Sequence, residues 1–149
     1  MRRVLLALTG LALALHVVGC DAVGDQPEAY RGVVEVSVVA LDASAYGLRL
    51  VAVEDRGCDR RLVVSTRFDA ERQRIEVEGI GPETPCDGLL PASAVVPLVR
   101  AGGGAFVEVR HRDSADLYVL LDDVAGGPSL QTIRATTTRP AEESAAARG

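Results

Sequence analysis

The feature that most constrains the fold is a succession of short apolar runs between residues 32 and 138. Each run is rich in Val, Leu, Ile and Thr, and Gly, Pro, Asp or Ser separates it from the next. Apolar and polar residues alternate in several runs, as in Arg74–Glu78, and no run keeps the spacing of a helical stripe. Short strands at intervals of about 8–12 residues are typical of β-sandwiches and β-barrels. The chain is therefore predicted to be all-β.

We expect a single antiparallel β-sandwich, immunoglobulin-like or similar, of about seven or eight strands over residues 32–138. The predicted strands span 33–41, 47–54, 61–68, 73–80, 93–99, 105–112, 116–122 and 129–137. Pro97 has no N–H group to donate to a sheet, so strand 93–99 is assigned to an edge. That edge and the loops at the ends of the sandwich are the predicted contact surfaces.

Two hairpins follow from placing apolar residues on one buried face. The first turns near Ala70 and Glu71 and pairs Phe68 with Gln73, Thr66 with Ile75, Val64 with Val77, and Leu62 with Gly79. The second turns near Ser114 and pairs Val107 with Leu121, Val109 with Val119, His111 with Leu117, Arg110 with Tyr118, and Arg112 with Asp116. In this register, Arg110 over the Tyr118 ring is a candidate cation–π pair.

The first nineteen residues have the pattern of an export signal. Met1-Arg2-Arg3 is positively charged, and an apolar stretch from Val4 to Val18 follows. A helix over that stretch reaches roughly 22 Å, which is short of the ~30 Å hydrocarbon core of a bilayer. The stretch ends in Val17-Val18-Gly19-Cys20, with Asp21 next. This ending resembles the lipobox of bacterial lipoproteins, in which a small residue precedes an obligatory cysteine.

The resemblance implies that cleavage of a 1–19 signal peptide leaves Cys20 as the first residue of the mature chain, lipidated on its thiol. Two or three acyl chains hold a protein at a membrane, whereas one chain gives only reversible attachment. The expected location is the bacterial cell envelope, with the domain facing the periplasm or the exterior; inner and outer membrane both remain open. Residues 20–31 are expected to form a flexible tether, and residues 139–149 a disordered tail.

The cysteine count agrees with export. The chain has 3 cysteines, and lipidation of Cys20 leaves Cys58 and Cys86 as an even pair in a compartment where disulfides form. Neither belongs to a Cys-x-x-Cys motif of the kind used in redox or zinc sites. We therefore predict a structural disulfide between Cys58 and Cys86. It would close a loop of about 29 residues, worth roughly 3.5 kcal/mol in the chain-entropy model.

The charge balance argues against a nucleic-acid partner. All 16 basic residues are arginine, and 21 acidic residues give a formal charge of −5. An acidic domain does not collect phosphate backbones. Aromatic platforms for stacking bases are also scarce, because the chain has only 3 tyrosines and 2 phenylalanines.

A catalytic or metal site has little support in the sequence. His111 is the only histidine after the leader, and Asp113, Ser114 and Asp116 follow it in a predicted turn. No Gly-x-Ser-x-Gly motif accompanies them, so a structural histidine is the alternative interpretation. Zinc lacks ligands, and no Asp-x-Asp-x-Asp-Gly calcium loop exists. The acids near strand ends, which remain calcium candidates, are Glu54, Asp55, Asp59, Asp113, Asp116, Asp122 and Asp123.

The leading hypothesis is therefore a membrane-anchored envelope lipoprotein with a non-catalytic β-sandwich for binding or assembly. No cofactor, metal or catalytic residue is expected. Its expected partners are the membrane, through the lipid on Cys20, and another envelope protein. Two alternatives remain: a small periplasmic hydrolase that uses His111, and an inhibitor or accessory subunit of another envelope protein.

Overall fold

A computed structural model describes residues 26–58, 60–69, 72–82, 88–99, 105–123 and 127–141. The predicted signal peptide, Cys20, Cys86 and the chain after residue 141 lie outside this part. The described residues form nine strands: β1 Val34–Ala40, β2 Tyr46–Cys58, β3 Leu62–Asp69, β4 Arg72–Ile80, β5 Leu89–Pro97, β6 Ala105–His111, β7 Ser114–Asp123, β8 Gly127–Arg134 and β9 Thr138–Pro140.

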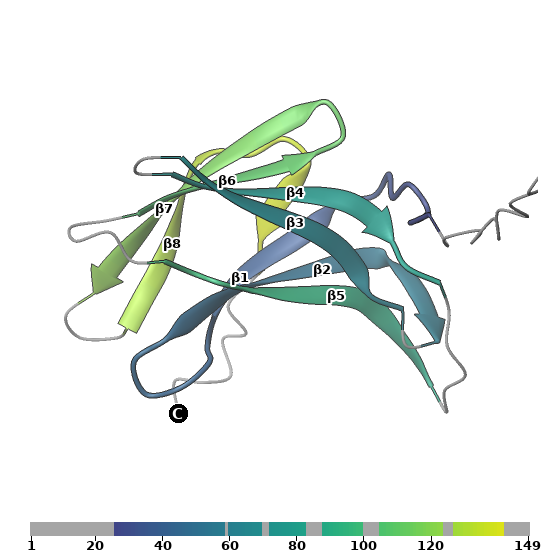
Figure 1. Ribbon diagram of the computed structural model, residues 1–149, viewed down its shortest axis with the longest axis horizontal. Coiled ribbons are helices and arrows are strands. Elements are labelled where there is room, and N and C mark those ends of the chain that lie inside the picture. The colour runs from purple at the N-terminus through teal and green to yellow at the C-terminus, as the bar shows by residue number, and fades with distance from the viewer. Residues whose placement is uncertain are drawn as a thin grey trace, which may run out of the picture.

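The strands form two sheets that pack face to face (Figure 1). The four-stranded sheet has the order β5-β2-β1-β9, and the five-stranded sheet has the order β3-β4-β6-β7-β8. The predicted all-β sandwich is confirmed, and so is the edge position of the strand that contains Pro97. Pairing is not antiparallel throughout, because β4 runs parallel to β6 and β1 runs parallel to β9. Between β4 and β6 the chain passes through β5 in the other sheet. It therefore reverses direction twice, and β6 runs in the same direction as β4.

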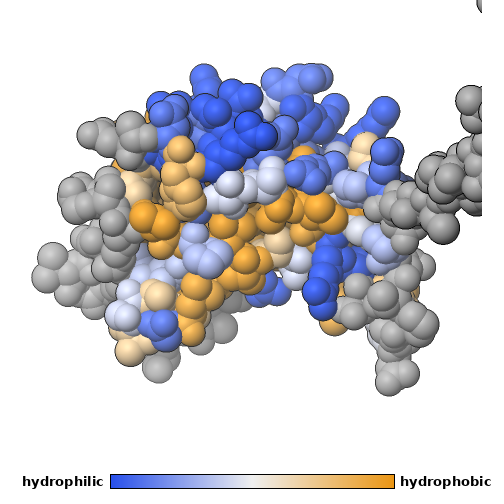
Figure 2. Space-filling model, viewed as in Figure 1, coloured by the Kyte–Doolittle hydropathy of each residue, from blue (hydrophilic) through white to orange (hydrophobic). Residues whose placement is uncertain are grey.

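The core lies between the sheets and consists mainly of aliphatic side chains. Alternate residues of each strand supply it, as Val34 and Val36 do on β1. The largest fully buried apolar side chains are Val34, Val36, Leu48, Leu50, Ile75, Val107, Val109 and Tyr118. Burying such a side chain contributes about 1.5–3 kcal/mol. In Figure 2 hydrophilic side chains gather along the top of the view, over the five-stranded sheet, and a hydrophobic band lies beneath them.

The predicted β3–β4 hairpin is largely confirmed. Phe68 pairs with Gln73, Thr66 with Ile75, and Val64 with Val77, as expected. The pairing of Leu62 with Gly79 is wrong, because a bulge between Val63 and Val64 places Leu62 opposite Ile80. Gly79 has a φ of +153° at this bulge, in a region that favours glycine. A Cβ atom there would also collide with the carbonyl oxygen of Glu28.

The predicted β6–β7 register is wrong. The turn contains two residues, Arg112 and Asp113, and Arg112 adopts a φ of +59°. His111 consequently pairs with Ser114, and Val107 with Tyr118. The displacement relative to the prediction is three residues, and an odd displacement turns each side chain of the strand to the other face. Tyr118 therefore lies in the core and is fully buried, which rules out the cation–π pair with Arg110.

The domain extends beyond both predicted boundaries. Residues 28–31 were assigned to the tether, yet Glu28 and Ile80 exchange two backbone hydrogen bonds of 2.8 Å. Tyr30 packs against the core. At the other end, the predicted boundary at 138 divides β9, and the Ala141 N–H group donates to the carbonyl oxygen of Val36 at 2.9 Å. Both segments were too polar for sequence periodicity to identify them, because they dock through backbone groups and single side chains.

Candidate functional site

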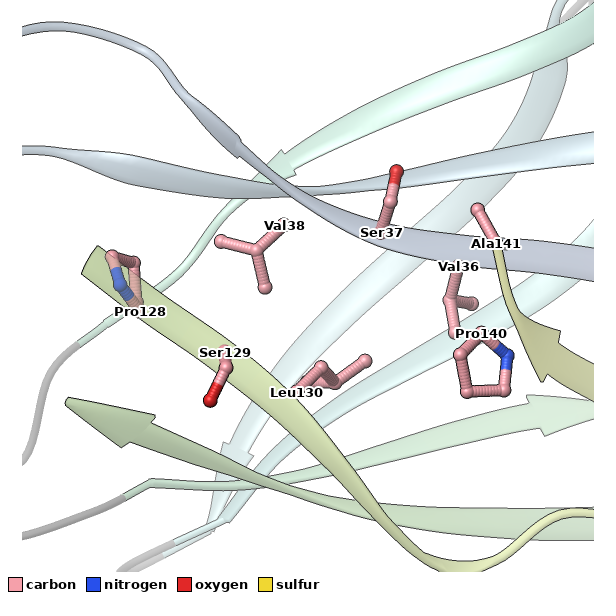
Figure 3. A pocket seen from close by; sticks show the side chains of 8 residues that line it. All are labelled: Val36, Ser37, Val38, Pro128, Ser129, Leu130, Pro140 and Ala141. Atoms are coloured by element: carbon pink, nitrogen blue, oxygen red, sulfur yellow. The ribbon is translucent and has the colours of Figure 1, made fainter. Parts of the chain in front are cut away.

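A groove between β1 and β8 has a volume of about 340 Å³ (Figure 3). It lies where the two sheets face each other beside the short strand β9. Its lining is about equally polar and apolar and consists of Val36, Ser37, Val38, Pro128, Ser129, Leu130, Pro140 and Ala141. A hollow of this size can take a few side chains of an extended ligand.

An open strand edge runs beside the groove. Strand β9 pairs with Val34–Val36 of β1, whereas β1 continues to Ala40. Val36 accepts a hydrogen bond from Ala141 on this side. Backbone groups of alternate residues point to the same side of a strand, so those of Val38 also point toward the open side. Within the described part of the chain, no strand pairs with β1 there. The groove thus combines side chains such as Val38 and Leu130 with backbone groups able to bind an extended segment.

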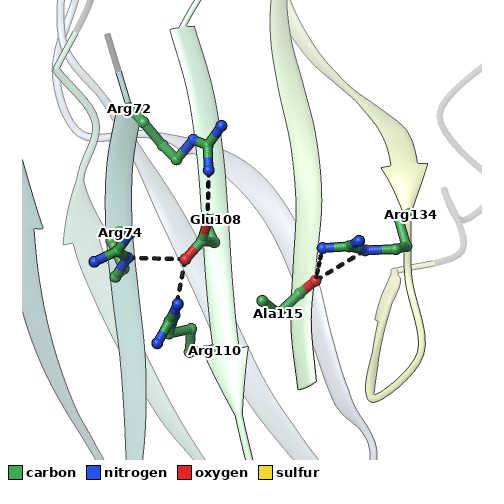
Figure 4. A network of polar contacts seen from close by, with 6 residues as sticks. All are labelled: Arg72, Arg74, Glu108, Arg110, Ala115 and Arg134. Carbon is green, nitrogen blue, oxygen red and sulfur yellow. Dashed lines mark hydrogen bonds and ion pairs between the residues drawn. The ribbon is translucent and has the colours of Figure 1, made fainter. Parts of the chain in front are cut away.

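Apart from the groove, a cluster of arginines around Glu108 lies on the outer face of the five-stranded sheet (Figure 4). The carboxylate of Glu108 on β6 accepts hydrogen bonds of 2.8 Å from Arg72 and Arg74 on β4 and from Arg110 on β6. Burial of the carboxyl opposes ionisation, but these three guanidinium groups outweigh it and lower the pKa of Glu108 to about 2. The cluster ties β4 to its parallel neighbour β6.

The sequence did not indicate this arginine cluster. Its four residues occur in the sequence as two pairs of alternate polar residues, Arg72-x-Arg74 and Glu108-x-Arg110. The two pairs lie at least 34 residues apart. Finding the cluster requires knowing that β4 lies beside β6, and that pairing depends on the crossover through the other sheet. The three arginines remain partly exposed, with 31–48% of each side chain accessible.

Asp116 lies inside the sandwich rather than in the predicted turn. It is fully buried on β7 and accepts five hydrogen bonds from Thr136, Thr137 and Thr138. Burial opposes its ionisation, but the Thr138 hydroxyl group and the three backbone N–H groups outweigh it, so the pKa of Asp116 is lowered. Its role in this structure is to hold the segment that leads into β9. Its carboxylate is therefore already committed to protein donors.

His111 occupies a buried position where it holds the N-terminal segment. Its side chain is 2% exposed, and its ring stacks on that of Tyr30 with centroids 5.6 Å apart. Its Nε2 atom lies 3.0 Å from the carbonyl oxygen of Tyr30, while Nδ1 has no hydrogen-bond partner among the described residues. These contacts favour the structural interpretation of this histidine.

The other residues of the hydrolase hypothesis do not converge on His111. Asp113 and Ser114 line a hollow of about 200 Å³ together with Arg110, Arg112 and Ala115, and His111 is not among its lining residues. The carboxylate of Asp116 bonds to threonines. The hydrolase hypothesis stays a prediction, with no geometric support added to it.

The calcium candidates do not gather in the part of the chain that the structure describes. No group of three or more His, Cys, Asp or Glu side chains there is placed to hold a metal ion. Asp55 instead bonds to Arg60 at 2.9 Å. Asp59 and the side chains of Asp122 and Asp123 lie outside the described part.

The predicted modification sites are only partly within the described residues. Cys58 ends β2 and lies opposite Leu89 of β5. Its predicted partner Cys86 belongs to segment 83–87, which lies outside the described residues, so the disulfide stays a prediction. The same holds for lipidation of Cys20. No helix with the length and apolar character needed to cross a membrane occurs in the residues that the structure describes.

Comparisons of the chain with protein-family models, with curated proteins and with solved structures gave no match.

Proposed function

We propose that this protein is an envelope lipoprotein, anchored through a lipid on Cys20, whose β-sandwich is a non-catalytic binding module. The leader and its Val17-Val18-Gly19-Cys20 ending support the anchor. A disulfide between Cys58 and Cys86 is part of the same proposal, because both cysteines then lie in an oxidising compartment. The groove between β1 and β8 is the proposed binding site.

The observation that carries the binding role is the open edge of β1 at the rim of a groove that Val38, Pro128 and Leu130 help to line. An extended segment can add to such an edge as a further strand, with its main chain bonding to exposed backbone groups and alternate side chains entering the groove. Here β9 already occupies the first part of that edge, beside Val34–Val36. The proposed ligand continues this pairing along β1 and is an extended, apolar segment of another envelope protein.

Crosslinking in intact cells tests this proposal. A photoreactive residue in place of Ser37, which lines the groove, should capture one dominant protein. The same residue in place of Ser44, exposed in the loop after β1, should not capture it. A peptide made from the captured segment should then slow hydrogen exchange of the Val38 amide. Equal capture from both positions, or unchanged exchange at Val38, would contradict the proposal.

Two substitutions on β8 make the test quantitative. Ser129→Tyr places a large ring at the groove, because Ser129 is part of its lining. This variant should bind the captured peptide at least about tenfold more weakly, which corresponds to about 1.4 kcal/mol. Gln131→Tyr is the matched control: Gln131 is exposed two residues further along β8 and does not line the groove. Binding should be unchanged in the control.

A further inference from the structure

The end of the sandwich nearest the predicted anchor carries two unusually exposed leucines. Leu89 and Leu90 begin β5 and are 65% and 67% exposed, more than any other large hydrophobic residue we find in the described part of the chain. They pair with Cys58 and Gly57 at the end of β2. In Figure 1 these ends of β2 and β5 form a tip at the lower right of the view.

This tip extends beyond the core. Ala92 and Val96 of β5 face the core and are 0% and 5% exposed. Leu90 lies an even number of residues from both, so its side chain points to the same face of the strand. It is nevertheless 67% exposed. Leu89 points to the opposite face of the strand. A leucine on each face of a projecting strand end forms an apolar wedge that nothing within the described residues covers.

The chain enters the sandwich at this same end. Glu28 bonds to Ile80, the last residue of β4, and β4 ends where β3 begins and β2 finishes. Arg61, just before β3, forms a bridge with Ser93 in the middle of β5, so the first half of β5 extends past this end of β3. In Figure 1 the purple N-terminal end of the coloured chain lies at the right of the view, as does the tip.

The length of the connection limits how far this end can lie from a membrane. Because Glu28 bonds to Ile80, the eight residues from Cys20 to Glu28 can span at most about 28 Å when fully extended. Near the entry point Arg60 bonds to both Glu28 and Asp55, while Arg56 and Arg61 are exposed. The two exposed leucines supply the apolar contact surface at this end.

We infer that the tip containing Leu89 and Leu90 docks into the interfacial region of the lipid bilayer to which the protein is anchored. This inference rests on the proposed anchor at Cys20. The anchor keeps the tip close to the bilayer and raises its effective concentration there, so weak apolar insertion suffices. The docked domain presents one fixed end to the membrane and keeps its far end, with Phe68, in water.

Tryptophan fluorescence tests the docking, because the natural chain contains no tryptophan. Leu90→Trp places one reporter on the tip, and Phe68→Trp places a control at the far end of β3, where the side chain is 60% exposed. Each full-length mature lipoprotein is reconstituted into phosphatidylcholine vesicles with and without brominated acyl chains. Emission from position 90 should shift to shorter wavelength and be quenched by the brominated lipid, whereas emission from position 68 should not. Leu89→Trp repeats the test if Leu90→Trp fails to fold.

The outcomes separate the docking from the anchor. Failure of the wild-type protein to float with vesicles, together with a mass spectrum that lacks lipid on Cys20, would overturn the anchor. If the protein floats but positions 90 and 68 are quenched equally, the anchor stands and the docking is wrong. High salt should leave the quenching at position 90 unchanged; loss of quenching in salt would overturn apolar insertion as its cause.

Discussion

The carboxylate of Asp116 accepts hydrogen bonds from both the backbone N–H and the hydroxyl group of Thr138, at 2.7 and 2.8 Å. Asp116 belongs to β7 of the five-stranded sheet, and Thr138 begins β9 of the four-stranded sheet. The buried Thr138 hydroxyl also contacts that of Tyr118. This contact joins the two sheets and fixes β9 against β1. It thereby sets where the open edge of β1 begins, and with it the groove.

Replacing Asp116 should loosen this junction. In Asp116→Asn an NH₂ group, which cannot accept a hydrogen bond, replaces one carboxylate oxygen and faces the N–H and hydroxyl donors of Thr136–Thr138. We therefore expect a loss of about 2–3 kcal/mol in the free energy of unfolding. Asp113→Asn, in the exposed turn of the same hairpin, should change it by less than about 0.5 kcal/mol. Urea denaturation of both variants gives the comparison. Equal stabilities would mean that the buried carboxylate does not hold β9.

The Glu108 cluster should make stability depend on pH in the acid range. The pKa of Glu108 is about 2 in the folded protein, against an ordinary value of 4.5. Its ionised form therefore stabilises the fold fully above pH 4.5, and this contribution is lost as the pH falls toward 2. The difference in unfolding free energy between the wild type and Glu108→Gln should shrink across that window. A difference that stays constant with pH would contradict the assignment of the stabilisation to the carboxylate.

Gly79 should be intolerant of a side chain. Gly79→Ala forces a φ of +153° on an L-residue and places a methyl group against Glu28. We expect a loss of about 1–3 kcal/mol and faster hydrogen exchange at the Glu28 and Ile80 amides. Gly88→Ala is the control, since a Cβ there meets nothing within 4 Å. Stability within about 0.5 kcal/mol of wild type is expected for it. If both variants behave alike, the N-terminal segment is not held as described.

The local patterns predicted well wherever a strand alternates between core and solvent. The run Gln73–Glu78 and its partner strand gave three correct cross-strand pairs, because a one-residue slip would have buried charged groups. The β6–β7 register was not constrained in this way. Its predicted form placed Leu121 and Val119 in the core, whereas the structure buries Tyr118 and Asp116. Burial of an aspartate is favourable here only because Thr136–Thr138 supply donors, and those residues lie about twenty positions away.

The amino-acid order alone determined that this chain is built from strands, which strand would be an edge, and that its N-terminus has the pattern of a lipoprotein leader. These properties are local: periodicity, a proline without an N–H group and an apolar stretch of limited length. Tertiary structure decided the parallel pairings, the arginines around Glu108, the burial of Asp116 and the groove beside β1. Each of these depends on contacts between segments far apart in sequence. Their energy comes from burial and hydrogen-bond satisfaction, which no local pattern encodes.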